Sequence, residues 1–209
     1  KQDVTLSLDA CGEPLSRRGY RSRKAIAPLN EVLAAGLLAL SGWEPGITLY
    51  DPMCGSGTFT CEAALWASGL PVQANRSHFA FMEWKNFNRT AWMTIRDEAM
   101  EFNEPIPTTI YASDINPDAI SQTKYALSQL DLPSHDVTVS LVDFFNSEPN
   151  STDGGMVVLN PPYGERMEPE DIDEMYGAMG DRLKFNWPGF KAWIISSNPE
   201  ASKHIGLKS

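Results

Sequence analysis

Four stretches of the sequence combine residues that could bind a ligand or hold a reactive group. The first, residues 51–58, reads Asp-Pro-Met-Cys-Gly-Ser-Gly-Thr. Its small residues let a ligand approach the backbone, and a helix starting there would offer free N–H groups. It is not a P-loop, because no Gly-Lys-Ser/Thr follows, nor a dinucleotide fingerprint, because Thr60 replaces the third glycine. The preceding Asp-Pro-x-Cys makes it a more specific binding-loop signal than the glycines alone.

Two aspartates follow later strand-like runs. Asp114 ends the run 110–113, where a carboxylate can accept both hydroxyls of a ribose. It lies 63 residues after Asp51 (114 − 51), whereas a simple nucleotide-binding unit places this acid about 20 residues on; an insertion explains the difference. Asp143 and Phe144 end another run, where a carboxylate can accept from an adenine amino group and an aromatic can pack on the ring. Taken singly, each aspartate could equally cap a helix or end a strand.

The most informative stretch is residues 160–164, Asn-Pro-Pro-Tyr-Gly. Prolines restrict the backbone and remove amide donors, so the Asn160 side-chain oxygen and backbone carbonyls can converge as acceptors. Tyr163 supplies a flat face for a base. A proline-rich turn alone would explain Pro161 and Pro162, but not the whole pentapeptide after an apolar strand.

Strand-like runs alternate with helix-like ones, which predicts an α/β domain with a mostly parallel central sheet flanked by helices. Ligands of such sheets bind outside the carboxyl ends of the strands. Strands are expected at residues 47–50, 110–113, 137–142, 156–159 and 192–196. Helices are expected at residues 29–40, 58–68, 117–130 and 172–185, with Asn116 as the N-cap of the third.

We expect a single domain over residues 1–209, with a basic lead-in at 1–27 and an insertion at 71–107. The insertion contains a helix at 84–102 and is expected to lie beside the sheet. The apolar stretch 32–43 is too short to span a bilayer, and no signal peptide opens the chain. Three cysteines without a C-x-x-C pair and three histidines predict neither disulfides nor a metal site, hence a reducing, cytoplasmic setting.

The charge distribution is uneven. Net charge is −10, which is awkward for a protein that binds nucleic acid. Residues 1–25 carry six basic and three acidic groups, so their balance is +3 and residues 26–209 carry −13. Five cations lie there without an intervening acid: Arg17, Arg18, Arg21, Arg23 and Lys24. They could form a nucleic-acid contact or simply a solvated basic turn.

At these motifs the sequence resembles the class I methyltransferases that modify amino nitrogens. More closely, it resembles the bacterial large-subunit ribosomal RNA guanine-N2 methyltransferases that carry a THUMP domain upstream. The supporting stretches are residues 15–21, 27–29, 33–37, 51–58, 75–77 and 160–164. The resemblance implies a Rossmann-like fold, S-adenosylmethionine as cofactor and ribosomal RNA as partner. The resemblance implies an upstream THUMP domain and a final hairpin after Ser209, and we expect both to be missing from these 209 residues.

The resemblance also implies residue roles. Asp114 would hold the ribose while Ile115 packs on the adenine, and Asp143 with Phe144 would address the adenine edge. The methionine part of the cofactor would be held by the first loop, which consists of Asp51, Pro52, Met53, Cys54, Gly55, Ser56, Gly57 and Thr58. The target amine would be addressed by the catalytic motif Asn160, Pro161, Pro162 and Tyr163. Independently of the resemblance, we hypothesise from the basic cluster that Arg17, Arg18 and Arg21 contact RNA phosphates near the site.

These roles suggest a mechanism. An exocyclic amine is a poor nucleophile because its lone pair is delocalised into the ring. Acceptors at Asn160 and the Pro161 carbonyl would localise that lone pair and aim it at the methyl group, so orientation supplies most of the acceleration. Tyr163 would stack on a base flipped out of any helix. Cys54 and Cys61 are expected to be structural.

The acceptor remains open at this level. Adenine N6 in DNA and a glutamine amide in a protein are methylated by enzymes with the same Asn-Pro-Pro-Tyr motif. A non-catalytic methyltransferase-like binding module is the alternative from another class. The intact Asp51, Gly55, Gly57, Asp114 and Asn160 argue against such a module.

Overall fold

The protein is described by a computed structural model that covers residues 3–21, 29–101, 104–130, 132, 136–162 and 169–207. Its centre is a sheet of five strands in the order β3-β2-β1-β4-β5. The strands are β1 (Leu49–Asp51), β2 (Thr109–Asp114), β3 (Asp136–Leu141), β4 (Gly155–Leu159) and β5 (Phe190–Ile194). Every neighbouring pair is parallel. The predicted α/β, Rossmann-like class is confirmed.

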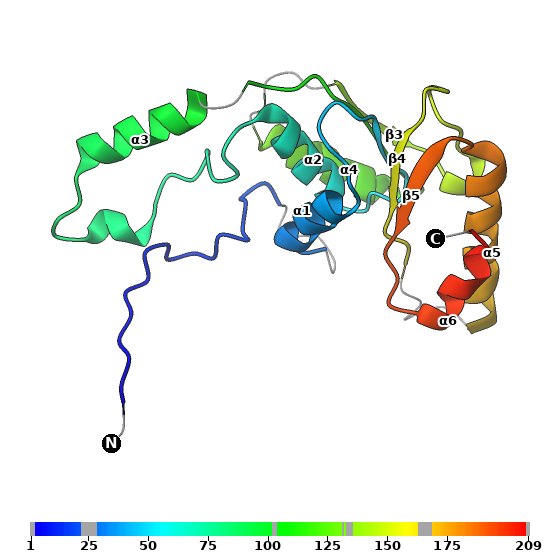
Figure 1. Ribbon diagram of the computed structural model, residues 1–209, viewed down its shortest axis with the longest axis horizontal. Coiled ribbons are helices and arrows are strands. Elements are labelled where there is room, and N and C mark those ends of the chain that lie inside the picture. Colours follow the sequence, from blue (N-terminus) through cyan, green and yellow to red (C-terminus); the bar gives the residue numbers. More distant parts are fainter. Residues whose placement is uncertain are drawn as a thin grey trace.

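Helices cover both faces of the sheet (Figure 1). One face carries α1 (Glu31–Leu40), α2 (Thr58–Ser68) and α4 (Pro117–Ser128), and the other carries α5 (Pro169–Asn186) with α6 (Pro199–Ser202). Short 3-10 helices lie at η1 (Ala80–Glu83), η2 (Phe144–Asn146) and η3 (Lys203–Ile205). The strand order reverses beside β1, where the ligand site of such a sheet is expected.

Alternation along the strands explains the two layers, since successive side chains point to opposite faces. In β1, Leu49 joins the core under α1 and α2, whereas Tyr50 joins the core under α5. The same division applies to β4, with Val158 on the first side and Val157 on the second. The strands are therefore buried on both faces, as parallel strands between helical layers are.

Capping side chains set several helix ends. Asn116 accepts a hydrogen bond from the Asp118 N–H at 2.9 Å and precedes Pro117 at the first helical position, as predicted. Asn30 caps α1 in the same way through the Leu33 N–H at 3.1 Å, so that helix begins two residues later than expected.

The insertion departs from expectation. Its helix α3 (Arg89–Glu101) starts later than predicted because the Asn88 side chain accepts from the Ala91 N–H at 3.1 Å. The helix projects away from the sheet instead of lying beside it (Figure 1), and none of its residues is buried. An aromatic cluster of its own explains this independence. That cluster consists of Phe79, Phe81, Phe87 and Trp92.

Within the described residues, no helix is both long enough and apolar enough to cross a membrane.

Candidate functional site

A cavity of about 450 Å³ lies at the carboxyl ends of the central strands. It is lined by Pro52, Met53, Gly55, Asp114, Ile115, Asp143, Phe144, Phe145, Asn160, Pro162 and Met175. All four predicted stretches contribute to it, although up to 110 residues separate them in the sequence (162 − 52). The sheet order brings them together, because β1, β2, β3 and β4 are neighbours whose carboxyl ends share one edge.

The loop after β1 uses its two glycines differently. Gly57 has φ +79°, and a Cβ there would lie 2.7 Å from Cγ2 of Thr123 on α4, so this glycine permits close packing of loop and helix. Gly55 has φ +55°, and no heavy atom lies within 4 Å of its would-be Cβ position. Since Gly55 lines the cavity, the open space at its Cα is room for a ligand.

Asp114 ties the second strand to this loop. One carboxylate oxygen accepts from the Gly55 N–H at 2.9 Å, and the other accepts from the Asn116 N–H at 2.9 Å. Asp114 therefore does take part in capping the following helix, through the Asn116 N–H. A carboxylate offers about four lone-pair sites, so each oxygen of Asp114 keeps a free acceptor position while it lines the cavity.

Asp51 lies beneath the loop, fully buried at 1% exposure. Oδ2 accepts a hydrogen bond from the Thr60 hydroxyl at 2.7 Å, while Oδ1 is buried without a hydrogen-bond partner among the described residues. Burial raises the pKa of this carboxyl to about 7, opposed by the hydrogen bonds from Thr60 and assisted by the negative charge of Asp114. Asp51 itself is not among the residues that line the cavity, although the next residues, Pro52 and Met53, are.

The third strand end supplies Asp143 and two phenylalanines. Asp143 caps η2 by accepting from the Phe145 N–H at 3.0 Å, and it also accepts from the Asn146 amide. Phe144 is buried in the core and contributes part of the cavity wall, together with Phe145. Ile115, across the cavity, is 69% exposed and therefore free to pack on a planar group.

The Asn-Pro-Pro motif follows β4 directly. Asn160 and Pro162 line the cavity, and Pro161 is buried. Tyr163 and Gly164 lie outside the described residues. The motif therefore faces the same space as the glycine loop, which is the arrangement that transfer between a cofactor and a second substrate requires.

Two further residues of the first loop, Cys54 and Ser56, lie in surroundings that indicate a structural role. Cys54 is buried, its N–H donates to the Ser113 carbonyl at 3.0 Å, and its Sγ lies 3.5 Å from the Thr123 hydroxyl oxygen. Burial raises the pKa of the Cys54 and Cys61 thiols well above the usual value, which disfavours a nucleophilic thiolate. Ser56 is half-buried and does not line the cavity.

The three predicted RNA-binding arginines differ in availability. Arg17 is 71% exposed and pairs with Glu13. Arg18, only 9% exposed, pairs with the buried Glu62, which also accepts from the Tyr20 hydroxyl at 2.8 Å. Arg18 is thus already paired within the fold.

Arg21 is engaged as well. Its guanidinium donates to the Leu29 carbonyl and to the Thr58 hydroxyl, and it lies 3.5 Å from the Glu31 carboxylate. Thr58 is the first residue of α2, so Arg21 fastens the N-terminal segment to the end of the glycine loop.

A family model confirms what this geometry suggests. The family described as RMKL-like, methyltransferase domain, matches residues 18–209. This chain is an RMKL-like methyltransferase domain. The family is thus established over nearly the whole chain, including all the stretches that line the cavity.

Known proteins similar to the RMKL-like domain bear related names. Ribosomal RNA large subunit methyltransferase K/L of Cellvibrio japonicus is 38% identical over 225 residues, which cover 100% of this chain and 29% of that protein. SMU.472, a candidate methyltransferase crystallised with SAH, superposes with a TM-score of 0.86 at 29% identity, covering 96% of this chain and 52% of the other. A Listeria monocytogenes protein described as a predicted N6-adenine-specific DNA methylase gives 0.86 at 31%, with the same coverages.

Two cavity residues were not predicted from the sequence. Phe145 and Met175 line the RMKL-like site, and Met175 comes from α5, on the far face of the sheet from the glycine loop. The signal for Phe145 was its position directly after Asp143 and Phe144. For Met175, the helical period of α5 gave only an apolar face and could not show that its first turns border the cavity.

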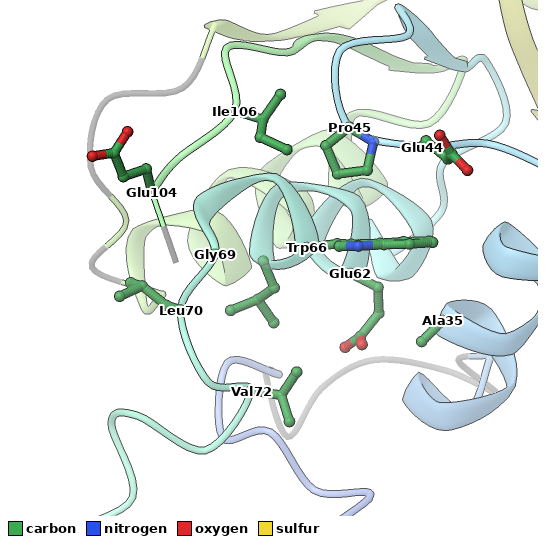
Figure 2. A pocket seen from close by; sticks show the side chains of 11 residues that line it. Ala35, Glu44, Pro45, Glu62, Trp66, Gly69, Leu70, Val72, Glu104 and Ile106 are labelled. Carbon is green, nitrogen blue, oxygen red and sulfur yellow. The ribbon is translucent and has the colours of Figure 1, made fainter. Parts of the chain in front are cut away.

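A second cavity, of about 520 Å³, lies on the outer side of α2 (Figure 2). Trp66 forms one wall, and the carboxylates of Glu44, Glu62 and Glu104 are spread around the space. None of the described residues that line it is a predicted cofactor or catalytic residue of the RMKL-like domain. Within the described residues no group of three or more His, Cys, Asp or Glu could hold a metal ion.

Proposed function

We propose that this domain transfers a methyl group from S-adenosylmethionine to an exocyclic amino group, that of guanine N2 in large-subunit ribosomal RNA. The observation that supports this most is the shared cavity, which joins the glycine loop, Asp114, Asp143 and Asn160. The chain spans 29% and 31% of the first two curated relatives, both named ribosomal RNA large subunit methyltransferase K/L. We also propose that the domain acts in the cytoplasm.

The residues present fit S-adenosylmethionine. Gly55 leaves open space at the cavity wall, and the buried Oδ1 of Asp51, which has no hydrogen-bond partner among the described residues, would receive the amino group of the methionine part. Asp114 has free acceptor positions for the ribose hydroxyls, with the exposed Ile115 beside it to pack on adenine. Asp143 would accept from the adenine amino group. When bound, the cofactor supplies an electrophilic methyl group on its sulfonium.

The Asn160 motif orients the second substrate. Its side-chain oxygen and the Pro161 carbonyl would accept the two amine hydrogens, which localises the nitrogen lone pair and directs it into the cavity. Tyr163 would stack on the base. Positioning of this kind is worth up to roughly 7–11 kcal/mol in favourable reactions, and no covalent nucleophile is required.

Adenine N6 is the second candidate acceptor, because one structural relative is described as a predicted N6-adenine-specific DNA methylase. Labelled cofactor offered with ribosomal RNA, with DNA and with a glutamine-containing peptide separates the alternatives. Label in guanine N2 supports the proposal, and label confined to adenine or to the peptide contradicts it.

Calorimetric titration with S-adenosylmethionine tests the cofactor site. We expect micromolar binding by the chain and its loss in Asp114→Ala, which removes both the ribose acceptor and the Gly55 anchor. Because that variant could also disturb the loop, Ile115→Ala is the sharper probe. It should bind about tenfold more weakly from the loss of buried apolar area, without change in thermal unfolding.

Ile95→Ala is the matched control, since Ile95 is a similarly exposed isoleucine on α3. It should bind like the parent chain. Equal affinity in Ile115→Ala and Ile95→Ala would contradict the adenine position, and no binding by the folded parent chain would contradict the cofactor site.

A further inference from the structure

A cleft of about 380 Å³ lies between the N-terminal segment and the first residues of the insertion. It is separate from the proposed methyl-transfer cavity, and the two share no lining residue. Its walls are Glu13, Arg17, Arg18, Gly19, Gln73, Asn75, Arg76, Ser77 and His78.

Hydrogen bonds between the two segments hold the cleft in shape. The backbone N–H groups of Ala80 and Phe81 donate to the carbonyls of Cys11 and Ala10, at 3.2 and 3.0 Å. Arg76 adds side-chain bonds from Nη2 to the carbonyls of Cys11 and Glu13, at 2.7 and 2.9 Å. Asn75 in turn donates to the Leu130 carbonyl at 2.8 Å, which ties this wall to the end of the α4 region. A ligand would therefore meet a largely preformed site.

The charge of this cleft is opposite to that of the chain. Three arginines and one histidine line it, against one glutamate. Among the described residues, the cavity of Figure 2 is instead lined by three glutamates without a lysine or arginine, and the methyl-transfer cavity by two aspartates without one. On a chain of net charge −10, this cleft therefore offers a polyanion a locally positive surface.

Two groups of the cleft can serve an anion. Arg17 and its partner Glu13 are 71% and 66% exposed, so their ion pair is weak and a phosphate can replace the glutamate. Arg76 lies over the ring of Phe79 at 4.5 Å, donates to the carbonyls of His78, Cys11 and Glu13, and has a buried Nη1, so it supplies a fixed positive charge in the wall of the cleft. Arg18, by contrast, is engaged with Glu62.

The cleft also lies near the cofactor loop. Arg18 lines it, and Arg21, three residues later, donates to the Thr58 hydroxyl at the end of that loop. Three residues of extended chain span at most about 11 Å. A strand of nucleic acid whose target base enters the methyl-transfer cavity would therefore pass the cleft within a few nucleotides.

We propose that this cleft binds a backbone phosphate of the RNA substrate. The phosphate replaces Glu13 as the ion-pair partner of Arg17, and Arg76 supplies a fixed positive charge. The inference rests on the proposed function for the nature of the polyanion. It revises the sequence-based assignment, because Arg18 and Arg21 then support the cleft and do not contact phosphate.

Fluorescence anisotropy with a labelled 20-nucleotide single-stranded RNA, titrated with the full chain at several salt concentrations, tests the proposal. Arg17→Glu should weaken binding about tenfold at low salt and reduce the slope of log affinity against log salt by about one. Ser77→Glu, which places a negative charge in the cleft at an exposed residue, should weaken binding comparably.

Lys203→Glu is the matched control. Lys203 is 69% exposed and pairs with Glu200, so this variant makes the same charge change as Arg17→Glu and also removes an exposed ion pair. Lys203 lies far from the cleft in the sequence and does not line it. Its affinity should stay within about twofold of the parent. Equal weakening in Arg17→Glu and Lys203→Glu, or no RNA binding by the parent chain, would overturn the proposal.

Titration of the same variants with S-adenosylmethionine keeps this test distinct from that of the proposed function. Arg17→Glu should retain full cofactor affinity. If the parent chain does not bind the cofactor but still binds RNA in a way that depends on Arg17, the methyl-transfer proposal is contradicted and the phosphate cleft remains supported.

Discussion

The carboxyl group of Asp51 lies in an environment very different from water. It is buried beneath the glycine loop with one oxygen unpartnered, and its pKa is raised to about 7 by burial. Between pH 4 and 7 the folded chain therefore holds a proton that the unfolded chain has lost. Stability falls as pH rises through this window, because the folded state binds the extra proton.

The variant Asp51→Asn should remove this pH dependence. Between pH 5 and 8 the parent should lose about 3 kcal/mol of unfolding free energy relative to the variant, at 1.4 kcal/mol per pKa unit. Urea unfolding at each pH measures the difference. Asp153→Asn, at an exposed carboxyl, should keep the parental slope; an unchanged slope in Asp51→Asn would mean that the carboxyl is not buried as described.

The arginines mark the limit of what residue types can predict. Their clustering in the sequence was evident, but whether each faces solvent depends on partners that lie far along the chain. Glu62, the partner of Arg18, is 44 residues away, and Thr58, bonded to Arg21, is 37 residues away. No local pattern contains such pairings. The aspartates and Asn160 were easier to place, because strand ends share an edge.

Among the secondary-structure elements, those with local end signals were predicted best. Helix α2 begins and ends at the predicted residues, 58 and 68, and α4 begins at the predicted Asn-Pro cap. Strand β5 was placed two residues too late, at 192–196 instead of 190–194. The alternation of Phe190, Lys191 and Ala192 is too short to fix a boundary without the partner strand.

Helix α5 allows a paired test of packing. A Cβ at Gly180 would lie 1.8 Å from the backbone oxygen of Ile205, whereas at Gly177 the nearest atom is 3.9 Å away. Gly177→Ala should therefore stabilise the chain by about 0.5–1 kcal/mol through helix propensity. Gly180→Ala should destabilise it by about 1–3 kcal/mol, because η3 must shift. Urea unfolding of both variants checks the prediction, and an opposite order would show that η3 does not pack on α5.

The insertion was the element least accessible to sequence reasoning. Its helix was expected at residues 84–102, in an insertion lying beside the sheet. In the structure Met93, Ile95 and Met100 are all exposed, and the aromatic cluster around Phe81 forms a separate small core. A period reveals that a helix has an apolar side, but not which surface covers it.

At the scale of the molecule, a buried ion pair attaches the N-terminal segment to the domain. Glu62 on α2 is 1% exposed and accepts from Tyr20 and Arg18. Burial raises the pKa of Glu62, while Tyr20 and Arg18 oppose that shift. Glu62 is thus the one buried carboxylate among the described contacts that attach this segment, which forms one wall of the proposed phosphate cleft, to α2.

The variant Glu62→Ala should lower the unfolding free energy by about 3–5 kcal/mol, since it leaves Arg18 buried without its charge partner. Trypsin should also cleave after Arg17 and Arg18 faster than in the parent. Glu13→Ala, which removes the exposed partner of Arg17, should cost less than about 1 kcal/mol. Equal effects of the two variants would contradict a structural role of the buried pair.

The overall architecture was predictable because the alternation of strands and helices admits few arrangements. The position of the cavity followed from it, and nine of its lining residues belong to the predicted set, Phe145 and Met175 being the exceptions. What the sequence could not supply was the orientation of the segments outside the sheet. Those segments pack through single side chains such as Arg76, whose acceptors at Cys11 and Glu13 lie more than 60 residues away.

The sheet order has a consequence for how the chain folds. Pairings at the two sides are fairly local: Thr109 meets Asp136 and Gly155 meets Phe190, across 27 and 35 residues. The central strand pairs Leu49 with Met156, across 107 residues, and closing so long a loop slows folding. The two halves should form first and β1 should join them late. The cavity draws on both halves and on the loop after β1, so the ability to bind a ligand should be the last property the folding chain acquires.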